Sequence, residues 1–386
     1  MLLLHFYYKS LECVFMESRI FAEIERQKDE IAQALMDLIR IPAVGPENGG
    51  EGEIAKAEKL TQMLTEIGFD KIERYDAEDP RVPSKKRPNI LAYMNGETST
   101  ERILIMTHLD VVPAGDESLW TATKPFEPIF DGEKIYGRGS EDNGQDLIAS
   151  VFAVKALKAL SIKPKKTVVL AFCADEEWGS KYGIQHLIKL GLFRKNDLIV
   201  VPDGGDPKGG SILIAEKGTL WMRIHTTGTQ SHGSRPDMGL NANRVGMECS
   251  LALDKLLHEK YSLKDPHFEP PMSTFEPTQK EKNVDAINII PGEDVVCFDC
   301  RVLPQYDVED VVNTFRNVAR EFEKKTGAKI DVQIPNKVLA SATDENSKIV
   351  TILRESIRNA RHIEPKAIGI GGGTCSAYLR HANIPA

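Results

Sequence analysis

The sequence predicts an α/β protein that has a mostly parallel sheet with helices on both faces and an inserted ferredoxin-like α+β domain. Three observations lead to this fold class. Strand and helix patterns alternate along the first half of the chain, two strand patterns are apolar at every position, and the order of elements changes near Gly218. Alternation favours parallel strands joined by helices, and strands buried on both faces are apolar throughout.

The first half of the chain alternates between helices and strands. Apolar residues at helical spacing predict a helix over 19–41, which Pro42 ends, and another over 53–67, which stops at Gly68 as at a C-cap. The next elements expected are strands at 89–95, 102–107, 167–173 and 197–201 and helices at 144–160 and 183–190.

The inserted domain is expected at 219–337, between the two parts of a catalytic domain at 16–218 and 338–386. The order β-α-β-β-α-β predicts a ferredoxin-like unit. Its expected elements are strands at 221–227, 285–290, 294–303 and 330–334 and helices at 241–257 and 308–325. Residues 346–386 then predict a helix, a glycine-rich turn and a second helix that rejoin the catalytic domain.

Composition favours a cytoplasmic protein with a small-molecule substrate. The 386 residues carry a formal net charge of -8, with a sequence pI near 5.7 and no basic stripe, which argues against a nucleic-acid partner. The six cysteines are scattered, and the Cys297/Cys300 pair lies in a strand pattern that points the two sulfurs to opposite faces.

Neither a signal peptide nor a membrane partner is expected. Residues 1–15 are apolar but have no charged leader or cleavage site, so we expect a disordered or mis-called N-terminal extension. No other apolar run approaches the length of a membrane span.

One histidine and several carboxylates lie where strands end or helices begin. His108 closes an apolar strand, Asp142 precedes a helix, and Asp203 follows a further strand. The carboxyl ends of parallel strands meet at one edge of a sheet, so these side chains are expected to converge on a metal ion. Taken singly, each has a simpler explanation: a strand-end histidine, an N-cap and a turn residue.

The run Asp175-Glu176-Glu177 is the most informative motif. Three consecutive carboxylates after a buried strand repel one another unless a cation binds them, although a solvated acidic loop is the alternative. Neighbouring residues of an extended chain point in opposite directions, so one glutamate can bind metal while the other acts as a base. Asp110 can accept the second ring N–H of His108 and so fix its tautomer.

Together these motifs resemble the co-catalytic zinc hydrolases, which include aminoacylase, carboxypeptidase G, succinyl-diaminopimelate desuccinylase, acetylornithine deacetylase and carnosinase-type dipeptidases. The resemblance covers residues 17–386. It implies hydrolysis of an amide bond in an N-acyl amino acid or dipeptide, by water activated by a two-metal centre and a glutamate general base. Zinc is the metal expected first, with cobalt or manganese as alternatives, and the acyl group is left open.

The resemblance also implies a role for each site residue. His108 and Asp203 would bind one metal ion, Asp142 would bridge, and Glu177 would bind the second ion. Asp110 would then orient His108, and Glu176 would be the general base.

By the same resemblance, the inserted domain is a lid and dimerisation domain of a homodimer. Its motif Ser231-His232-Gly233-Ser234-Arg235-Pro236 implies that His232 reaches across the dimer to stabilise the oxyanion. Substrate contacts are implied for Asn288, Arg301, Gly373 and Thr374. Arg301 is suited to a bidentate carboxylate clamp. Without the resemblance, His232 is equally a surface histidine and Arg301 equally a strand-edge ion pair.

Two departures from the family pattern open alternatives. Asn143-Gly144-Gln145 replaces a segment that often carries lysine, and the sequence ends at Ala386, before the family's final strand and its metal-binding histidine. His381 is a weak substitute for that ligand. The alternatives are a non-catalytic or impaired relative that keeps the fold and the dimer, and a metal-dependent binding module.

Overall fold

The computed structural model describes residues 16–386, and the prediction for residues 1–15 lies outside them. Of the described residues, 16–204 form one compact unit with Tyr378–Ala386, and Gly205–Ala377 forms the other. We call them unit 1 and unit 2. The predicted inserted domain at 219–337 is shorter than unit 2, and its boundaries stay a prediction.

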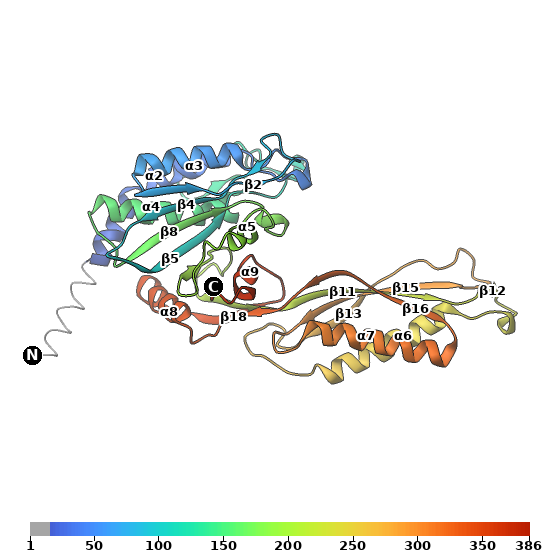
Figure 1. Ribbon diagram of the computed structural model, residues 1–386. Helices are drawn as coiled ribbons and strands as arrows, with labels where there is room; N and C mark the ends of the chain where they lie inside the picture. Colours follow the sequence, from blue (N-terminus) through green and yellow to red (C-terminus); the bar gives the residue numbers. More distant parts are fainter. Residues whose placement is uncertain (1–15) are drawn as a thin grey trace, which may run out of the picture. The chain divides into compact units, whose positions relative to one another are not determined.

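Unit 1 is built on a five-stranded sheet in the order β1-β4-β8-β5-β9 (Figure 1). The strands are β1 (Lys71–Arg74), β4 (Ile90–Met94), β5 (Thr98–His108), β8 (Lys166–Cys173) and β9 (Leu198–Val200). β5 pairs in parallel with β8 and β9, whereas β4 runs antiparallel to β1 and β8. The prediction of a mostly parallel sheet is confirmed, and β1 is an additional strand.

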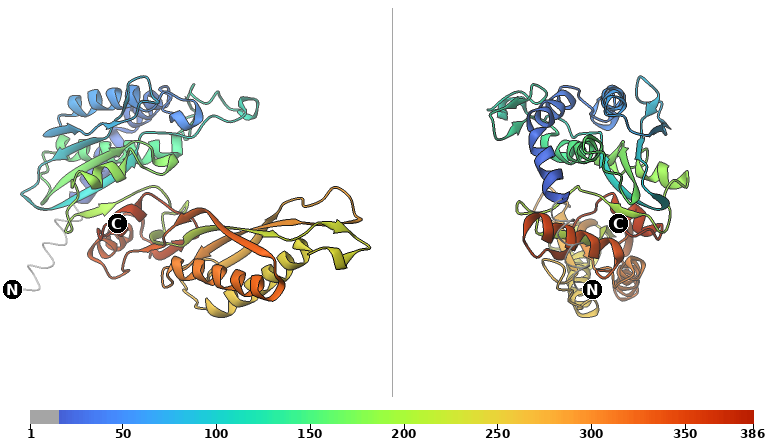
Figure 2. Two further views of the ribbon diagram at one scale, coloured as in Figure 1. Left: turned by 45° about the vertical axis from the view of Figure 1, so that its right-hand side comes forward. Right: turned by 90° about the vertical axis from the view of Figure 1, so that its left-hand side faces the viewer.

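Helices cover both faces of this sheet, as predicted. They are α2 (Lys28–Ile39), α3 (Ile54–Ile67), α4 (Asp146–Ala159) and α5 (Ile184–Lys189). A further helix, α9 (Ser376–His381), spans the point in the chain where unit 2 ends and unit 1 resumes. α2, α3 and α4 pack on one face, and α5 lies on the other (Figures 1 and 2). Leu60 and Leu64 of α3 are fully buried in the core that these helices form with the sheet. Burial of such side chains is the main stabilising contribution to the unit.

The helix ends follow the local sequence. α3 stops at Gly68, whose φ of 82° is left-handed and favours glycine, so the predicted C-cap is confirmed. A turn at Gln27 interrupts the helix predicted over 19–41. The short elements of unit 1 are η1 (Pro46–Asn48), β2 (Ala77–Glu78), β3 (Lys86–Arg87), η2 (Glu117–Leu119), β6 (Ile129–Phe130), β7 (Ile135–Tyr136), η3 (Ser140–Gln145) and η4 (Glu176–Trp178).

Unit 2 contains a four-stranded antiparallel sheet in the order β13-β15-β11-β16, with α6 and α7 on one face (Figure 2). The elements are β11 (Gly218–Thr227), α6 (Ala242–Lys260), β13 (Thr274–Lys280), β15 (Glu293–Val302), α7 (Val308–Thr326) and β16 (Lys329–Val338). Asn241 and Asp307 cap the two helices through their side chains. Chain order and sheet order are those of a ferredoxin-like unit.

The strand predicted over 285–290 is wrong. Only Ile289–Ile290 is extended there, as β14, and it pairs with β12 (Ser231–His232). β15 pairs with β11 on one side and with β13 on the other, and β13 contains Pro277 and is exposed along most of its length. Proline is tolerated on an edge strand, so it does not exclude β13 from the sheet.

A short helical turn, η5 (Pro236–Met238), also belongs to unit 2. The unit contains a second sheet, of three strands in the order β17-β10-β18. Its elements are β10 (Ser211–Glu216), β17 (Ser341–Ala342), α8 (Lys348–Arg361) and β18 (Lys366–Ile370). The sequence does not predict β18, since Gly369 weakens its strand pattern. A Cβ at Gly369 would lie 2.4 Å from Cε1 of Phe268, so a close packing contact requires glycine there.

Within residues 16–386, none of the helices combines the length and the apolar character needed to cross a membrane.

Candidate metal centre

The candidate ligands of unit 1 gather at the carboxyl ends of three parallel strands. His108 is the last residue of β5 and pairs in register with Cys173 at the end of β8. Glu176 and Glu177 follow β8 in η4, Asp203 follows β9, and Asp142 lies in η3 immediately before α4. The predicted convergence of these segments is therefore present in the structure, as expected at the carboxyl edge of a parallel sheet.

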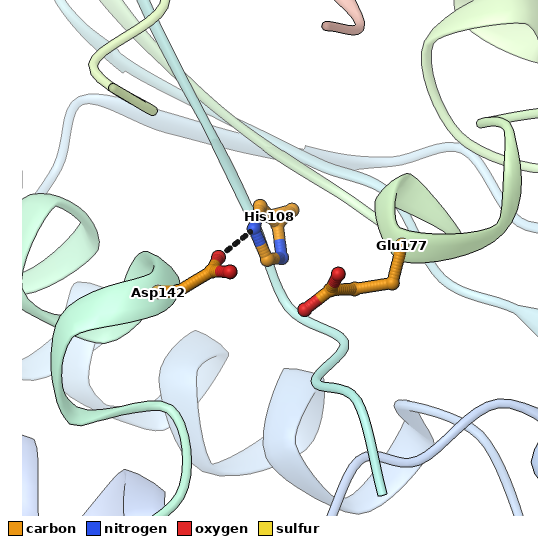
Figure 3. A group of neighbouring side chains, drawn as sticks. All are labelled: His108, Asp142 and Glu177. Carbon is orange, nitrogen blue, oxygen red and sulfur yellow. Dashed lines mark hydrogen bonds and ion pairs between the residues drawn. The ribbon is translucent and has the colours of Figure 1, made fainter. Parts of the chain in front are cut away.

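His108 lies between carboxylates on two sides (Figure 3). Its Nε2 is 2.9 Å from Oδ1 of Asp142 and 3.6 Å from Oδ1 of Asp203. The ring is buried, which by itself lowers its pKa, but hydrogen bonds to the surrounding aspartates outweigh burial and raise the pKa well above 6.5. Without a cation, His108 therefore carries a proton that balances the acidic groups around it.

Asp110 fixes the loop that carries the two glutamates. Its carboxylate accepts the backbone N–H groups of Glu176 and Glu177, each at 3.0 Å. The Nδ1 of His108 is closest to the backbone carbonyl of Asp110, at 2.9 Å, while the carboxylate Oδ1 is 3.6 Å away. Asp110 thus contacts both partners, and its main-chain oxygen is the better acceptor for the ring.

The two glutamates hold protons unusually tightly. Burial raises the pKa of Glu176 to about 8, and the carboxylates of Asp203 and Asp110 add to the shift. Burial also raises the pKa of Glu177 to about 7, together with the charge of Asp142. These shifts reflect burial first and neighbouring negative charge second, and a bound cation would favour the ionised carboxylates.

Two overlapping sets of side chains can hold a metal ion. The first is His108, Asp142 and Glu177, and the second is His108, Glu176 and Asp203; within each set the ligand atoms lie within 4.8 Å of one another. Figure 3 shows the first set, with the carboxylates of Asp142 and Glu177 directed toward the ring from opposite sides. One imidazole with several carboxylates is a donor set that suits zinc, manganese or cobalt.

The four ligands inferred from the resemblance are therefore all present in these sets, and the second set also contains Glu176, the inferred general base. Their division between two ions stays a prediction. Asp175, the first residue of the acidic run, belongs to neither set and is a structural residue. Its backbone is left-handed, with φ of 62°, and its Oδ2 accepts the N–H of Tyr182 at 3.0 Å.

A buried ion pair behind the site was missed by the sequence analysis. Arg87, which is fully buried, donates from Nε to Oε2 of Glu53 at 2.7 Å, and a second bond joins the same two side chains. Glu53 in turn accepts the backbone N–H of Asp175 at 3.3 Å. The pair supports the loop of Glu176 and Glu177. Neither residue stands out in the sequence, because Arg87 directly follows two lysines and Glu53 lies close to Glu51.

The predicted substrate residues of unit 2 fall into two groups, of which the first is exposed. His232 on β12 contacts Oγ of Ser234 through Nδ1 at 2.8 Å. Nδ2 of Asn288 lies 3.4 Å from Nε2 of His232, because β12 pairs with β14. The structure thus brings together the segments of His232 and Asn288, which are far apart in the sequence.

The second group is engaged in internal contacts. Arg301 donates from Nε and Nη2 to the carboxylate of Asp299 at 2.6 and 3.0 Å, and from Nη1 to Thr219 and to the carbonyl of Gly371. The face of the guanidinium suited to a bidentate clamp is therefore occupied by Asp299. Thr374 donates to Glu216, a buried residue that the sequence analysis did not single out, and Gly373 lies in the adjacent turn.

Residues 104–386 match the peptidase family M20/M25/M40. The chain belongs to this family. An uncharacterized metallohydrolase of Methanocaldococcus jannaschii is 40% identical over 370 residues, which are 92% of this chain and 90% of the relative. The M20 family comprises hydrolases that use divalent metals, so the chain is a metallohydrolase of this family, and the resemblance stated from the motifs is confirmed.

Two further similarities cover most of the chain. A succinyl-diaminopimelate desuccinylase of Nitratiruptor is 28% identical over 288 residues, 74% of each chain. The crystal structure of a tripeptidase of Staphylococcus aureus superposes with a TM-score of 0.67 at 18% identity, covering 92% of this chain and 87% of the other. At that identity the second similarity establishes the fold.

Proposed function

We propose that this M20 metallohydrolase cleaves an amide bond in an N-acyl amino acid or a dipeptide by means of a two-metal centre. The observation that carries the proposal is the convergence of one buried imidazole, at His108, with four carboxylates at the carboxyl edge of the sheet. Zinc is the metal we expect first, with cobalt or manganese as alternatives.

Each residue of unit 1 has a defined task in this proposal. His108 and Asp203 would hold one ion, Glu177 would hold the second, and Asp142 would contribute to both. When bound, the ions polarise the scissile carbonyl and lower the pKa of water.

Glu176 takes the proton from the attacking water and delivers it to the leaving amine. Asp110 keeps Glu176 and Glu177 at fixed positions through their backbone N–H groups. The high pKa of Glu176 without metal means that two nearby cations are what make it a base at neutral pH.

Unit 2 supplies the substrate contacts in this proposal. We assign His232 as an oxyanion donor that acts across a homodimer, with the ferredoxin-like part of unit 2 as lid and dimerisation domain. Asn288 and the Gly373–Thr374 turn contact the substrate. For Arg301 we retain a substrate role, which requires that it release Asp299 or act through Gly371. A cytoplasmic location and a small-molecule substrate without nucleic-acid or membrane partners complete the proposal.

The relatives suggest two substrate classes, N-succinyl amino acids and short peptides. The test is a hydrolysis screen with N-succinyl-diaminopimelate, N-acetylornithine and dipeptides, on protein reconstituted with zinc, cobalt or manganese. Chelator-treated protein and the Glu176→Gln variant are the controls. Metal-dependent turnover that is lost in Glu176→Gln supports the proposal. Metal-loaded protein that hydrolyses none of the three classes contradicts it and favours the non-catalytic alternative.

A further inference from the structure

Asn143 connects the segments that carry three of the candidate metal ligands. It directly follows Asp142, and its side chain is buried, with 2% exposure. Its Oδ1 accepts the backbone N–H of His108 at 3.2 Å. Its Nδ2 donates to the carbonyl of Pro202 at 2.8 Å and to Oδ1 of Asp203 at 3.2 Å. One amide thus ties the end of β5, the start of α4 and the loop after β9.

The chemistry of these contacts requires an amide. A primary amide offers one acceptor and two donor hydrogens. The neighbours present one backbone N–H on one side and three oxygens on the other, since Oδ2 of Asp146 also lies 3.4 Å from Nδ2. The reversed orientation of the Asn143 amide would set donor against donor at His108 and acceptor against acceptor at Pro202. An apolar side chain of the same size would remove the partner of the buried N–H of His108 and of the half-buried carbonyl of Pro202.

The contact with Asp203 bears on metal binding. The oxygen that accepts from Asn143 is the one that lies 3.6 Å from Nε2 of His108. A donor to one oxygen restricts rotation of the carboxylate and fixes which lone pairs face the centre. Hydrogen bonds to ligating carboxylates act in this way in metal sites, and their loss typically lowers metal affinity about 10–100-fold.

We propose that Asn143 is a positioning residue of the metal centre, which sets the geometry of His108 and Asp203 around Asp142 without contacting substrate. The inference rests on the proposed metal centre and deepens it. Asn143 raises metal affinity because it holds the ligand segments at their spacing before the ion arrives. It accounts for a buried polar side chain that the hydrolytic mechanism does not otherwise use.

The test is the Asn143→Leu variant, which keeps the size of the side chain and removes its hydrogen bonds. Zinc affinity is measured by competition with a chromophoric chelator, and ligand geometry by the visible spectrum of the cobalt-loaded protein. We expect affinity to fall about 10–100-fold and the cobalt spectrum to change. If the variant does not fold, Asn143→Ala, which leaves room for a water at the N–H of His108, is measured in the same way.

The matched control is Asn283→Leu in unit 2. Asn283 also donates from Nδ2 to an aspartate, Oδ1 of Asp294, at 2.9 Å, but it contacts no candidate ligand among the described residues. We expect it to lower the melting temperature and to leave zinc affinity and the cobalt spectrum unchanged.

Folded Asn143 variants with wild-type zinc affinity and cobalt spectrum would overturn the inference, as would wild-type protein that binds neither metal. Neither readout needs turnover. Wild-type protein that binds zinc but hydrolyses no substrate contradicts the proposed function, and the Asn143 measurement still decides the inference.

Discussion

The candidate residues of the two units differ in how they are held. In unit 1, His108 and Asp110 are buried and bonded to segments that carry other site residues. In unit 2, His232 is exposed on a two-residue strand, and Arg301 is bonded to its own strand neighbour Asp299. Unit 1 therefore holds its candidate residues through its own fold, whereas in the proposed function the residues of unit 2 would act only together with substrate or a second subunit.

The largest effect is expected from Glu176→Gln, which removes the proposed general base of unit 1. The amide keeps the shape of the side chain but cannot take a proton from water, so turnover should fall about 10²–10⁴-fold. Metal content by elemental analysis should stay at the wild-type value. Retained turnover would show that another group is the base.

The second prediction concerns His232 and tests whether unit 2 acts only with a partner subunit. Loss of an oxyanion donor in His232→Ala should lower kcat about 10²–10³-fold. His225→Ala, on β11 of the same unit, should retain activity.

Mixing His232→Ala with Glu176→Gln subunits should restore activity, because one site of each hybrid dimer has both groups. After refolding together, about a quarter of all sites should be active. Absence of recovery in mixtures that bind metal and dimerise would exclude a role in trans.

The third prediction is a pH dependence of the metal centre. Glu176 and Glu177 have pKa values of about 8 and about 7 in the metal-free protein, against 4.5 for an ordinary glutamate. Bound protons must leave before a metal binds, so zinc affinity should fall about 10-fold per pH unit for each proton displaced as the pH drops below 7. By the same proton linkage, a zinc affinity that does not change between about pH 5.5 and 7.5 would contradict the placement of these two glutamates at the metal centre.

The same groups set the stability of the metal-free protein. A carboxyl group whose pKa is raised by folding stabilises the fold when protonated, and this contribution is complete below the unfolded pKa of 4.5. It is lost as the pH rises through about 8. His108, whose pKa is also raised, acts in the same direction. The melting temperature of metal-free protein should thus fall from pH 5 to pH 8, and bound zinc should reduce that fall.

The smallest effect is expected for Arg301→Lys. Lysine cannot bond to Asp299 in bidentate fashion and at the same time reach Thr219 and Gly371. We expect a rise in KM of a few-fold with little change in kcat, through a looser Gly371–Thr374 turn. A change in kcat alone, or no change in either kcat or KM, would show that Arg301 does not contribute to substrate binding.

Much of the fold followed from the sequence where a local pattern decides the outcome. Apolar runs located β5 and β8, and Gly68 marked the end of α3. β13 and β18 were missed because Pro277 and Gly369 weaken the strand pattern. Pro277 is tolerated because β13 is an exposed edge strand, and Gly369 is needed because the strand packs closely against Phe268. Neither feature is visible in the local sequence.

As with the fold, the sequence predicted those parts of the candidate site that depend on local pattern and topology. Strand ends located the candidate metal ligands, because topology alone brings these side chains to one edge. The buried amide of Asn143 and the pair of Glu53 with Arg87 were not predicted, since their partners lie 34 or more residues away in the chain. For Arg301 the sequence raised a strand-edge ion pair as an alternative but did not identify the partner, Asp299, because the side-chain conformation selects it.

Zinc titration of wild-type protein and Asp142→Ala, followed by calorimetry and elemental analysis, tests the central claim most directly. Asp142 bonds to His108 and belongs to the proposed bridge between the two ions. We predict that the wild type binds zinc in two steps of unequal affinity and that Asp142→Ala weakens both steps while remaining folded. Wild-type protein that binds no zinc, or a folded Asp142→Ala variant with unchanged binding, would contradict a two-metal centre at His108.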